Sequence, residues 1–369
     1  MDDNQLNYFE IALLSVIIMI AHIILDFPNV IIESVGSSAI INVIYITILA
    51  LIFFVVIEKL LAPFEGKNIL YVSEFVGGKP LKIIVSLLYT SYLIFASATV
   101  IRSFAEMLKV IYFPEAALWT IIAPFIIVAI IANLSGSKTI VKVNTLLVPP
   151  ILLTMIILFL SSIKSFDPNK IFPILGNGVN ATFITGSSNI YTFVGLIYIF
   201  LLKTNLKNSK DLKKAGFVAV IILSVYLLLG VTSLLMLFPF LTSGNNVLSV
   251  YLSTRTVRFG KFMPRTDALF MLVWIFNFLL YLSVIIMFIV KINKDGIAIK
   301  SSSPSIYLSA ILIFIIALLP QNTAQISFLN TTCYKYAALF TVFVISFIIL
   351  LIGHFKKKKY LRVTVKSNA

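Results

Sequence analysis

Ten long apolar runs, bounded by polar residues, proline or glycine, constrain this chain more than any other feature of its sequence. A helix that crosses the hydrocarbon core of a membrane needs about 20 mostly apolar residues. The runs are unbroken rather than alternating, which favours spanning helices over strands. They fall at residues 8–32, 38–60, 80–108, 115–133, 145–163, 181–202, 212–238, 266–290, 304–320 and 332–354. The chain is therefore predicted to be an all-α membrane protein with ten transmembrane helices.

The composition excludes a water-soluble protein. Hydrophobic residues make up 60% of the 369 residues and charged residues only 12%, whereas an average soluble domain has about 25% charged residues. A soluble enzyme, a nucleic-acid-binding domain and a disordered chain are all excluded on this basis. A single cysteine and two histidines leave no basis for a His–Cys metal site. Because no nucleotide, zinc-protease or serine-hydrolase motif occurs, we expect neither an enzyme nor a cofactor.

The basic residues predict the orientation of the chain. With a cytoplasmic N-terminus, twenty of the 29 Lys and Arg residues lie in cytoplasmic segments, as the positive-inside rule requires. An even number of spans then places the C-terminus on the same side. The tail at 355–369 is basic and would act as a topology signal that also attracts anionic lipid. Residues 64–79 are predicted to form a short helix on the inner surface, and residues 239–265 form a long outer segment.

Two spans carry sequence signals for a broken helix. The first span contains AHIILDFPNV, and a proline disfavours helical backbone in the residue before it. The sixth span opens with ATFITGSSNIYTFVG, which is too rich in glycine and polar residues for a good continuous helix. The alternative is that these residues merely kink two helices, which membrane helices tolerate.

The two breaks occupy corresponding positions in two five-span halves, at about 8–163 and about 181–354. Such a pair is typical of a 5+5 inverted-repeat transporter fold of the LeuT type, in which the binding site lies at the breaks near the bilayer midplane. We expect the chain to form a single transmembrane domain of this kind, with helices one and six broken.

Several polar side chains are candidates for that site. Asp26 is an acidic group at membrane depth, where such groups are functional by default, and it would bind an amino group or a cation unless it lies hydrated at the outer interface. His22 would either hydrogen-bond Asp26 or pack in the core. Arg102 and Glu106, four residues apart, are expected to form an interfacial ion pair. Further candidates, which would line a cavity or join helices, are Ser188, Asn189, Asn277 and Tyr281.

Five stretches point to a known family. They are LDFPN in the first span, VIRSFAEMLKVIYFPEAALW across spans three and four, DPNKIFPILGNGV before span six, FVG within span six, and MPRTDALFMLVWIFNF in span eight. Together, and in this order, they resemble the B subunit of GerA-type spore germinant receptors. These endospore germination permeases belong to the amino acid–polyamine–organocation superfamily.

The resemblance implies a location, partners and a pocket. The chain would lie in the inner membrane of the spore and bind a small, amino acid-like germinant. It would act with an A-type membrane subunit and a C-type lipoprotein subunit. The family's pocket positions map to Tyr92, Ala96, Val194, Gly195, Leu280 and Tyr281.

The chain also departs from the family pattern. Where the family has Gly-x-Gly in its first break, this chain has Ala21, His22 and Ile23, so Ile23 is the remaining pocket candidate. Family carboxylates are replaced by Val100 and Ile197. Loss of the glycines removes a close approach of backbone to a carboxylate. Two other functions therefore stay open: an amino-acid or cation transporter, and a structural subunit with a vestigial pocket.

Overall fold

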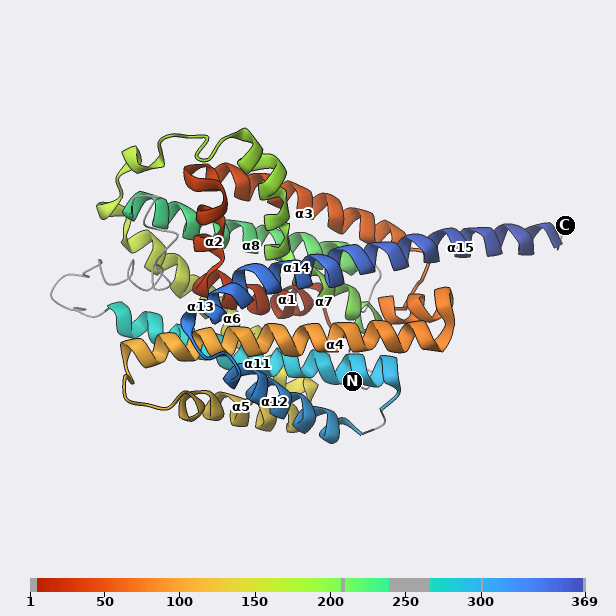
Figure 1. Cartoon of the computed structure of the whole chain (residues 1–369). Coiled ribbons are helices and arrows are strands. Elements are labelled where there is room, and N and C mark those ends of the chain that lie inside the picture. The colour runs from red at the N-terminus through yellow and green to blue at the C-terminus, as the bar shows by residue number, and fades with distance from the viewer. Residues whose placement is uncertain (1–4, 207–209, 239–265, 300, 368–369) are drawn as a thin grey trace.

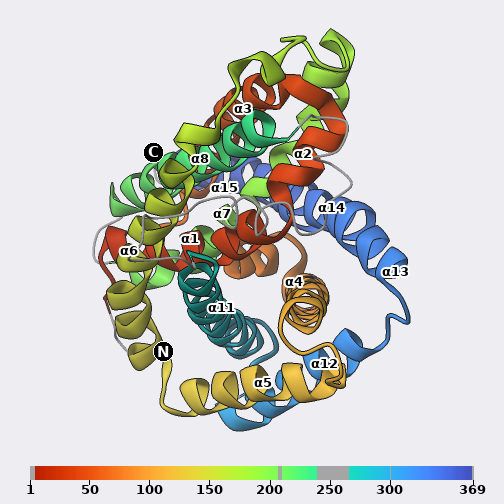
Figure 2. The same ribbon diagram turned by 90° about the vertical axis from the view of Figure 1, so that its left-hand side faces the viewer.

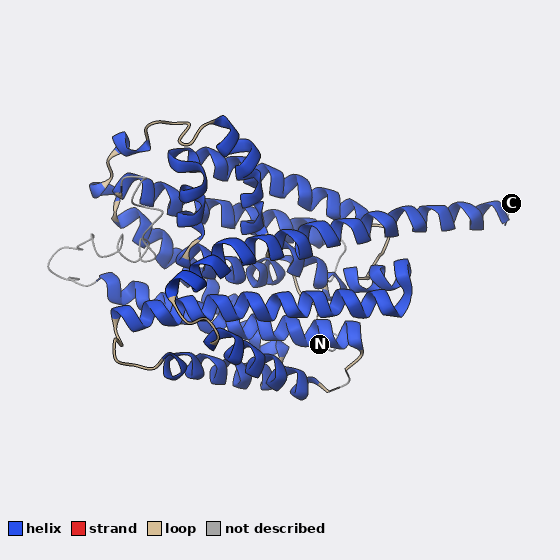
Figure 3. Cartoon of the chain, in the orientation of Figure 1, coloured by secondary structure: helices blue, strands red, loops and turns tan. Residues whose placement is uncertain are grey.

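The computed structural model describes residues 5–206, 210–238, 266–299 and 301–367, and these residues are helical almost throughout (Figure 3). The long outer segment 239–265 lies outside the described residues. The longer helices are α1 (Tyr8–Leu25), α3 (Ala39–Leu61), α4 (Ile69–Ile111), α5 (Leu118–Leu134), α6 (Ser137–Ser161), α8 (Lys210–Leu237), α11 (Thr266–Ile297), α12 (Ser302–Leu318) and α15 (Ser346–Ser367). The shorter ones are α2 (Phe27–Val35), η4 (Asn180–Ile184), η5 (Thr185–Phe193), α7 (Leu196–Leu201), α13 (Thr323–Phe328), η7 (Leu329–Cys333), α14 (Tyr334–Ala338) and η8 (Leu339–Ile345).

The structure has a helical segment at each of the ten predicted spans. Within the described residues, seven helices are long and apolar enough to cross a membrane, and two shorter apolar helices, α5 and α12, lie at Leu118–Leu134 and Ser302–Leu318. The remaining predicted span is the irregular segment from η4 to α7. The chain is therefore a multi-pass, all-α membrane protein.

Helix α1 is the centre of the bundle. Every residue from Ile11 to Leu25 is buried, as expected for a helix that is apolar on all sides. Figure 2 shows α1 between α8 and α11, with α5 and α12 on the periphery beyond α11. These outer helices expose apolar side chains such as Ile127, Ile131, Leu308 and Ile311. Such faces suit contact with lipid tails rather than water.

The first predicted break is confirmed. Asp26 separates α1 from α2 and has non-helical backbone angles, with φ −144° and ψ −23°. Pro28 lies in the first turn of α2, where its missing N–H is not needed. Figure 1 shows α2 running crosswise to α1.

The second break is also confirmed and is more extended. The chain passes through a π-helical turn in η4 and a 3₁₀ segment in η5 before α7 restores regular α-helix. Both irregular stretches lie against α2 and α3. Non-helical backbone at membrane depth is tolerated where it is buried in protein or lines a cavity, and both breaks meet that condition by facing each other.

Helix α4 combines the predicted surface helix with the third span. It kinks at Gly77 and Gly78, and Gly78 has φ +73°, a left-handed conformation that favours glycine. Pro80 follows in the next turn. The glycine pair thus turns the chain from a short segment starting at Ile69 into the long span.

Both ends of the described chain lie at the same end of the bundle. Gln5 and Lys357 both approach the segment around Lys67 and Tyr71, and Figure 1 shows α15 projecting beyond the bundle on this side. We refer to this end as the termini face and to the other end, which carries Gly36 and Asn322, as the opposite face.

Candidate functional site

Aromatic side chains fill the region between the two helix breaks. We call His22, Phe27, Tyr92, Tyr191, Tyr281 and Tyr334 the aromatic cluster. The His22 ring lies 4.9 Å from Phe27, 4.7 Å from Tyr334 and 5.9 Å from Tyr281. All six side chains are buried. The cluster therefore joins both breaks to spans three, eight and ten.

His22 packs in this cluster, which is one of the two roles expected for it; the other was a hydrogen bond to Asp26. Its Nε2 atom lies 3.3 Å from the hydroxyl of Tyr334, whereas one buried carboxylate oxygen of Asp26 has no hydrogen-bond partner among the described residues. The expectation of a bond between His22 and Asp26 is therefore wrong. The helical hydrogen bonding continues to Asp26, whose backbone N–H donates to the His22 carbonyl at 2.9 Å, and Asp26 then departs from helical geometry with φ −144°.

Several polar groups in and near the cluster are buried and have no hydrogen-bond partner in the part of the chain that the structure describes. They are the hydroxyls of Tyr191 and Tyr281, the amide of Asn277 and the indole N–H of Trp274. A buried polar group without a hydrogen bond costs about 1–3 kcal/mol. Unpaired donors and acceptors between broken helices are the arrangement that a ligand or water would complete.

A cavity of about 270 Å³ opens toward the opposite face next to Asp26. Its walls come from the break between α1 and α2, from α4, and from α13 and η7. We call it the acidic pocket, because Asp26, Glu33 and Glu106 line it and none of its lining residues in the described part of the chain is a lysine or an arginine. Its other lining residues are Leu25, Asn29, Val30, Ser103, Met107, Val110, Thr323, Ile326, Ser327, Asn330 and Thr331.

One of the three carboxylates is already paired. Nε of Arg102 donates to Glu106 at 3.0 Å, and the two side chains form the predicted ion pair at 2.9 Å. Arg102 is only 4% exposed and also donates to the carbonyl of Ala317 at 3.0 Å. Arg102 joins α4 to the end of α12, and among the described residues neither Asp26 nor Glu33 forms an ion pair.

A second polar network holds the irregular backbone of span six. The Asn42 amide on α3 donates to the carbonyls of Thr182 and Gly186 at 2.7 and 3.1 Å. Asn189 in turn donates to Asn42 Oδ1 at 2.9 Å and to Ser34 at 3.0 Å. These bonds satisfy carbonyls that a regular helix would satisfy internally. Asn42 carries no periodic or motif signal that would have identified this role from the sequence.

The predicted site residues fall into three groups. Asp26 lines the acidic pocket, and Tyr92 and Tyr281 belong to the aromatic cluster. Asn189 lies in the span-six network, while the Ser188 hydroxyl turns back to the carbonyl of Thr185. The remaining candidates are buried: Ile23, Ala96, Asn277 and Leu280 lie in helices, and Val194 and Gly195 lie in the turn between η5 and α7.

Gly195 illustrates the third group. Its N–H donates to the sulfur of Met19 at 3.2 Å, and its carbonyl accepts from Ser15 at 2.7 Å. A Cβ atom at this position would lie 2.7 Å from Met19 Cε. The glycine therefore permits close contact between the second break and α1, with the Met19 side chain packed directly against it.

Solved structures share the fold of this chain. A Na⁺-coupled sialic acid symporter in a substrate-bound, outward-open state matches with a TM-score of 0.63 at 12% identity, over 92% of this chain and 80% of the symporter. Mhp1, a nucleobase–cation-symport-1 family transporter in a closed conformation, matches with a TM-score of 0.62 at 14% identity, over 94% and 78% of the two chains. This likeness shows the LeuT-type fold alone.

Sequence relatives are spore germination proteins. Spore germination protein KB of Bacillus subtilis is 24% identical over 208 residues, which is 55% of each chain. GerQB of Bacillus cereus is 22% identical over 336 residues, covering 89% of this chain and 90% of GerQB. Spore germination protein A2 of Bacillus subtilis is 24% identical over 74% of this chain and 76% of its own. Because a model of the spore germination protein family matches residues 5–326, this chain belongs to that family of germination permeases.

Proposed function

We propose that this chain is the germinant-binding membrane subunit of a spore germinant receptor. The observation that carries the proposal is the unpartnered, buried carboxylate oxygen of Asp26, which lies at a helix break and lines a cavity. A carboxylate in this position gains an ion pair and hydrogen bonds when a ligand supplies a positive group. Membership in the germination family supports the biological context.

The ligand of this site carries an amino group or another cationic centre. Asp26 and Glu33 have no cationic neighbour among the pocket-lining residues, and Glu106 is already bound by Arg102. The Asn330 amide donates to the Ser103 hydroxyl at 2.5 Å, and both residues line the pocket. Ala21 and Ile23 replace the two family glycines that would expose backbone to a carboxylate, so the proposal rests on recognition of the amino group.

Binding would act through the helices that form the pocket. A ligand shifts a conformational equilibrium only by its differential affinity for two states. The walls belong to α2, α4 and α13, and α2 also contacts η5 and α8. A ligand that bridges Asp26 and the Asn330 wall would favour one spacing of these helices. In the proposed receptor, an A-type membrane subunit and a C-type lipoprotein subunit would respond to that change in helix spacing.

The proposal also assigns the location and orientation. The chain would lie in the inner spore membrane with its termini face toward the cytoplasm, because most lysines and arginines lie on that side. The acidic pocket then opens outward, where a germinant arrives.

Substitution of the carboxylate tests the proposal. Spores carrying Asp26→Asn are expected to lose the response to one or a few amino-bearing germinants, measured as release of core solutes across a panel of compounds. Glu115→Gln removes an exposed carboxylate after α4 and serves as the matched control. An Asp26→Asn strain that responds like the control to every compound would contradict the proposal and leave the vestigial-pocket alternative.

Transport is the second candidate, because the two structural neighbours are transporters. A transporter must open the aromatic cluster toward the termini face to release its substrate. Proteoliposomes that hold the purified chain separate the two functions. Saturable uptake of a radiolabelled germinant that Asp26→Asn abolishes would establish transport, whereas binding without uptake supports a sensor.

A further inference from the structure

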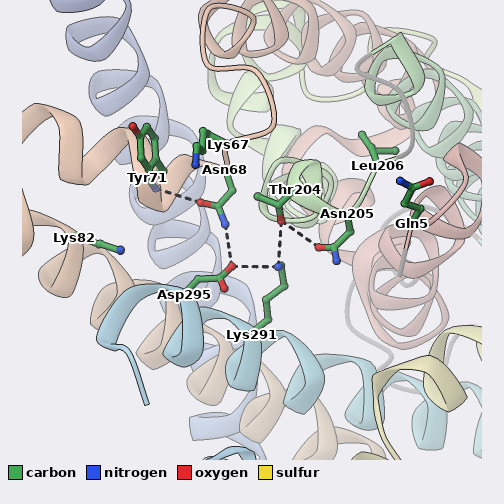
Figure 4. Close-up of a pocket in the computed structure, with 10 residues that line it drawn as sticks. All are labelled: Gln5, Lys67, Asn68, Tyr71, Lys82, Thr204, Asn205, Leu206, Lys291 and Asp295. Carbon is green, nitrogen blue, oxygen red and sulfur yellow. Dashed lines mark hydrogen bonds and ion pairs between the residues drawn. The ribbon is translucent and has the colours of Figure 1, made fainter. Parts of the chain in front are cut away.

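A second cavity, of about 460 Å³, opens on the termini face (Figure 4). Four segments meet there: the residues before α1, the start of α4, the residues after α7, and the end of α11. We call it the basic pocket. Its lining residues are Gln5, Lys67, Asn68, Tyr71, Lys82, Thr204, Asn205, Leu206, Lys291 and Asp295.

The charges that line this pocket are mainly positive. Among the described lining residues there are three lysines and one carboxylate, Asp295, which pairs with Lys291 at 3.1 Å. Lys82 pairs with Glu74 at 2.8 Å at the side of the pocket. Lys67 has no carboxylate partner among the described residues, and its ammonium group lies 4.7 Å from the ring centroid of Tyr71. At least one cationic group thus remains available to a ligand.

A hydrogen-bond network makes the pocket a built structure rather than a loose surface. The Asn68 amide donates to Asp295 at 3.0 Å, and the Lys291 ammonium donates to Thr204 at 3.3 Å (Figure 4). The backbone N–H of Leu6 donates to the carbonyl of Asn205 at 2.7 Å. Lys291 is only 9% exposed, so its position is fixed by its two partners.

The polar groups on the walls are mostly hydrogen-bond donors or can act as donors. Amide, hydroxyl and ammonium groups surround the space, and Asn68, the N-cap of α4, lies on its wall. Helix N-termini favour anions, and lysine is a standard phosphate ligand. The volume exceeds what a bare inorganic ion requires and leaves room for an ester group attached to it.

We propose that the basic pocket binds a phosphate-bearing anion through Lys67, Lys82 and Lys291. The anion is either the headgroup of an anionic phospholipid or a free phosphate ester. The site is separate from the acidic pocket at the opposite face, so the proposal does not depend on which germinant is bound there. An occupied basic pocket would hold the residues after the second helix break against α4 and α11.

Thermal unfolding of the purified full-length chain tests this site. In one arm, the chain is placed in phosphatidylcholine nanodiscs and titrated with inorganic phosphate and with glycerol 3-phosphate, against chloride at equal ionic strength. In the second arm, the nanodiscs contain phosphatidylglycerol. We expect a saturable rise in Tm in at least one arm, because a ligand that binds the folded state stabilises it. Response in the first arm identifies a free ester, and response in the second alone identifies a lipid.

Two substitutions with opposite effects make the test specific. Lys67→Gln is expected to raise the apparent dissociation constant about tenfold or more, since a hydrogen bond to a charged group contributes about that factor to binding. Lys67 is exposed, so its replacement should not unfold the chain. Asp295→Asn removes the one carboxylate among the described lining residues and frees Lys291, and it is expected to tighten binding.

Lys138→Gln is the matched control, because it removes an exposed lysine at the start of α6. The control should bind like the wild type. Absence of a saturable response in both arms would overturn the proposal. Equal losses in Lys67→Gln and Lys138→Gln, or weaker binding in Asp295→Asn, would overturn it as well.

Discussion

The hydroxyl of Tyr334 lies 3.3 Å from Nε2 of His22, and the two rings stack with centroids 4.7 Å apart. This contact joins span ten to the last turn before the break in span one. His22 lies between Ala21 and Ile23, the two residues that replace the family's glycines. The contact therefore fills part of the region between the two breaks with aromatic side chains.

Replacement of His22 should destabilise the chain by more than replacement of its only other histidine. His22→Ala removes stacked contacts with Phe27 and Tyr334 and leaves a buried cavity, which typically costs about 2–4 kcal/mol. His354→Ala, in the partly exposed helix α15, is expected to cost less than about 1 kcal/mol. Thermal unfolding of the three chains in one detergent measures both effects, and equal losses would refute a packing role for His22.

The sequence predicted the spans and both helix breaks because each depends on local chemistry. Pro28 and the glycine- and serine-rich start of span six disfavour regular helix wherever they occur. The ion pair between Arg102 and Glu106 was also predictable, since residues four apart share one face of a helix.

The aromatic cluster could not be predicted in the same way. Phe27, Tyr191 and Tyr334 lie on three different spans, and each is an ordinary apolar residue within its own helix. Only the tertiary arrangement brings them around His22. The third wall of the acidic pocket was missed for a related reason: Asn330 and Thr331 precede the apolar run that defined span ten, so they were assigned to the preceding loop.

Two buried asparagines should respond in opposite ways to the same substitution. Asn42→Leu leaves the carbonyls of Thr182 and Gly186 without their donor, and we expect a loss of about 1–3 kcal/mol. Asn144 is also fully buried, but its amide has no hydrogen-bond partner among the described residues. Asn144→Leu should therefore be neutral or stabilising. The free energies of unfolding of the two variants give the comparison, and a larger loss in Asn144→Leu would contradict the network described here.

Alanine should be tolerated at position 195 only when the neighbouring side chain, Met19, is replaced by a smaller one. Gly195→Ala places a Cβ atom 2.7 Å from Met19 Cγ and Cε, and overpacking of this kind costs about 1–3 kcal/mol. The double substitution Met19→Ala with Gly195→Ala removes the clash and should restore part of the germination response that Gly195→Ala loses. If the double variant responds no better than the single one, the close approach of span six to α1 is not the reason for the glycine.

Lys203 should make the stability of the chain increase with pH in the alkaline range. Its ammonium group donates to the carbonyls of Leu61 and Phe64 at 2.7 and 2.9 Å, just beyond the end of α7. Burial lowers its pKa from 10.5 to about 8. Between these two values the unfolded chain binds more protons than the folded chain, so the free energy of unfolding rises with pH across this window. The neutral amine keeps two N–H donors for the same two carbonyls, so the contact survives deprotonation.

The comparison with Lys203→Met isolates this contribution. Relative to the variant, the wild type should gain stability as pH rises from about 8 to about 10, and the difference between them should be constant below that window. Unfolding midpoints of both chains, measured at intervals of pH in the same detergent, provide the test. Lys138→Met removes an exposed lysine on the same face and should leave the pH dependence unchanged. A difference between wild type and Lys203→Met that stays flat across the alkaline range would show that the buried amine does not titrate there.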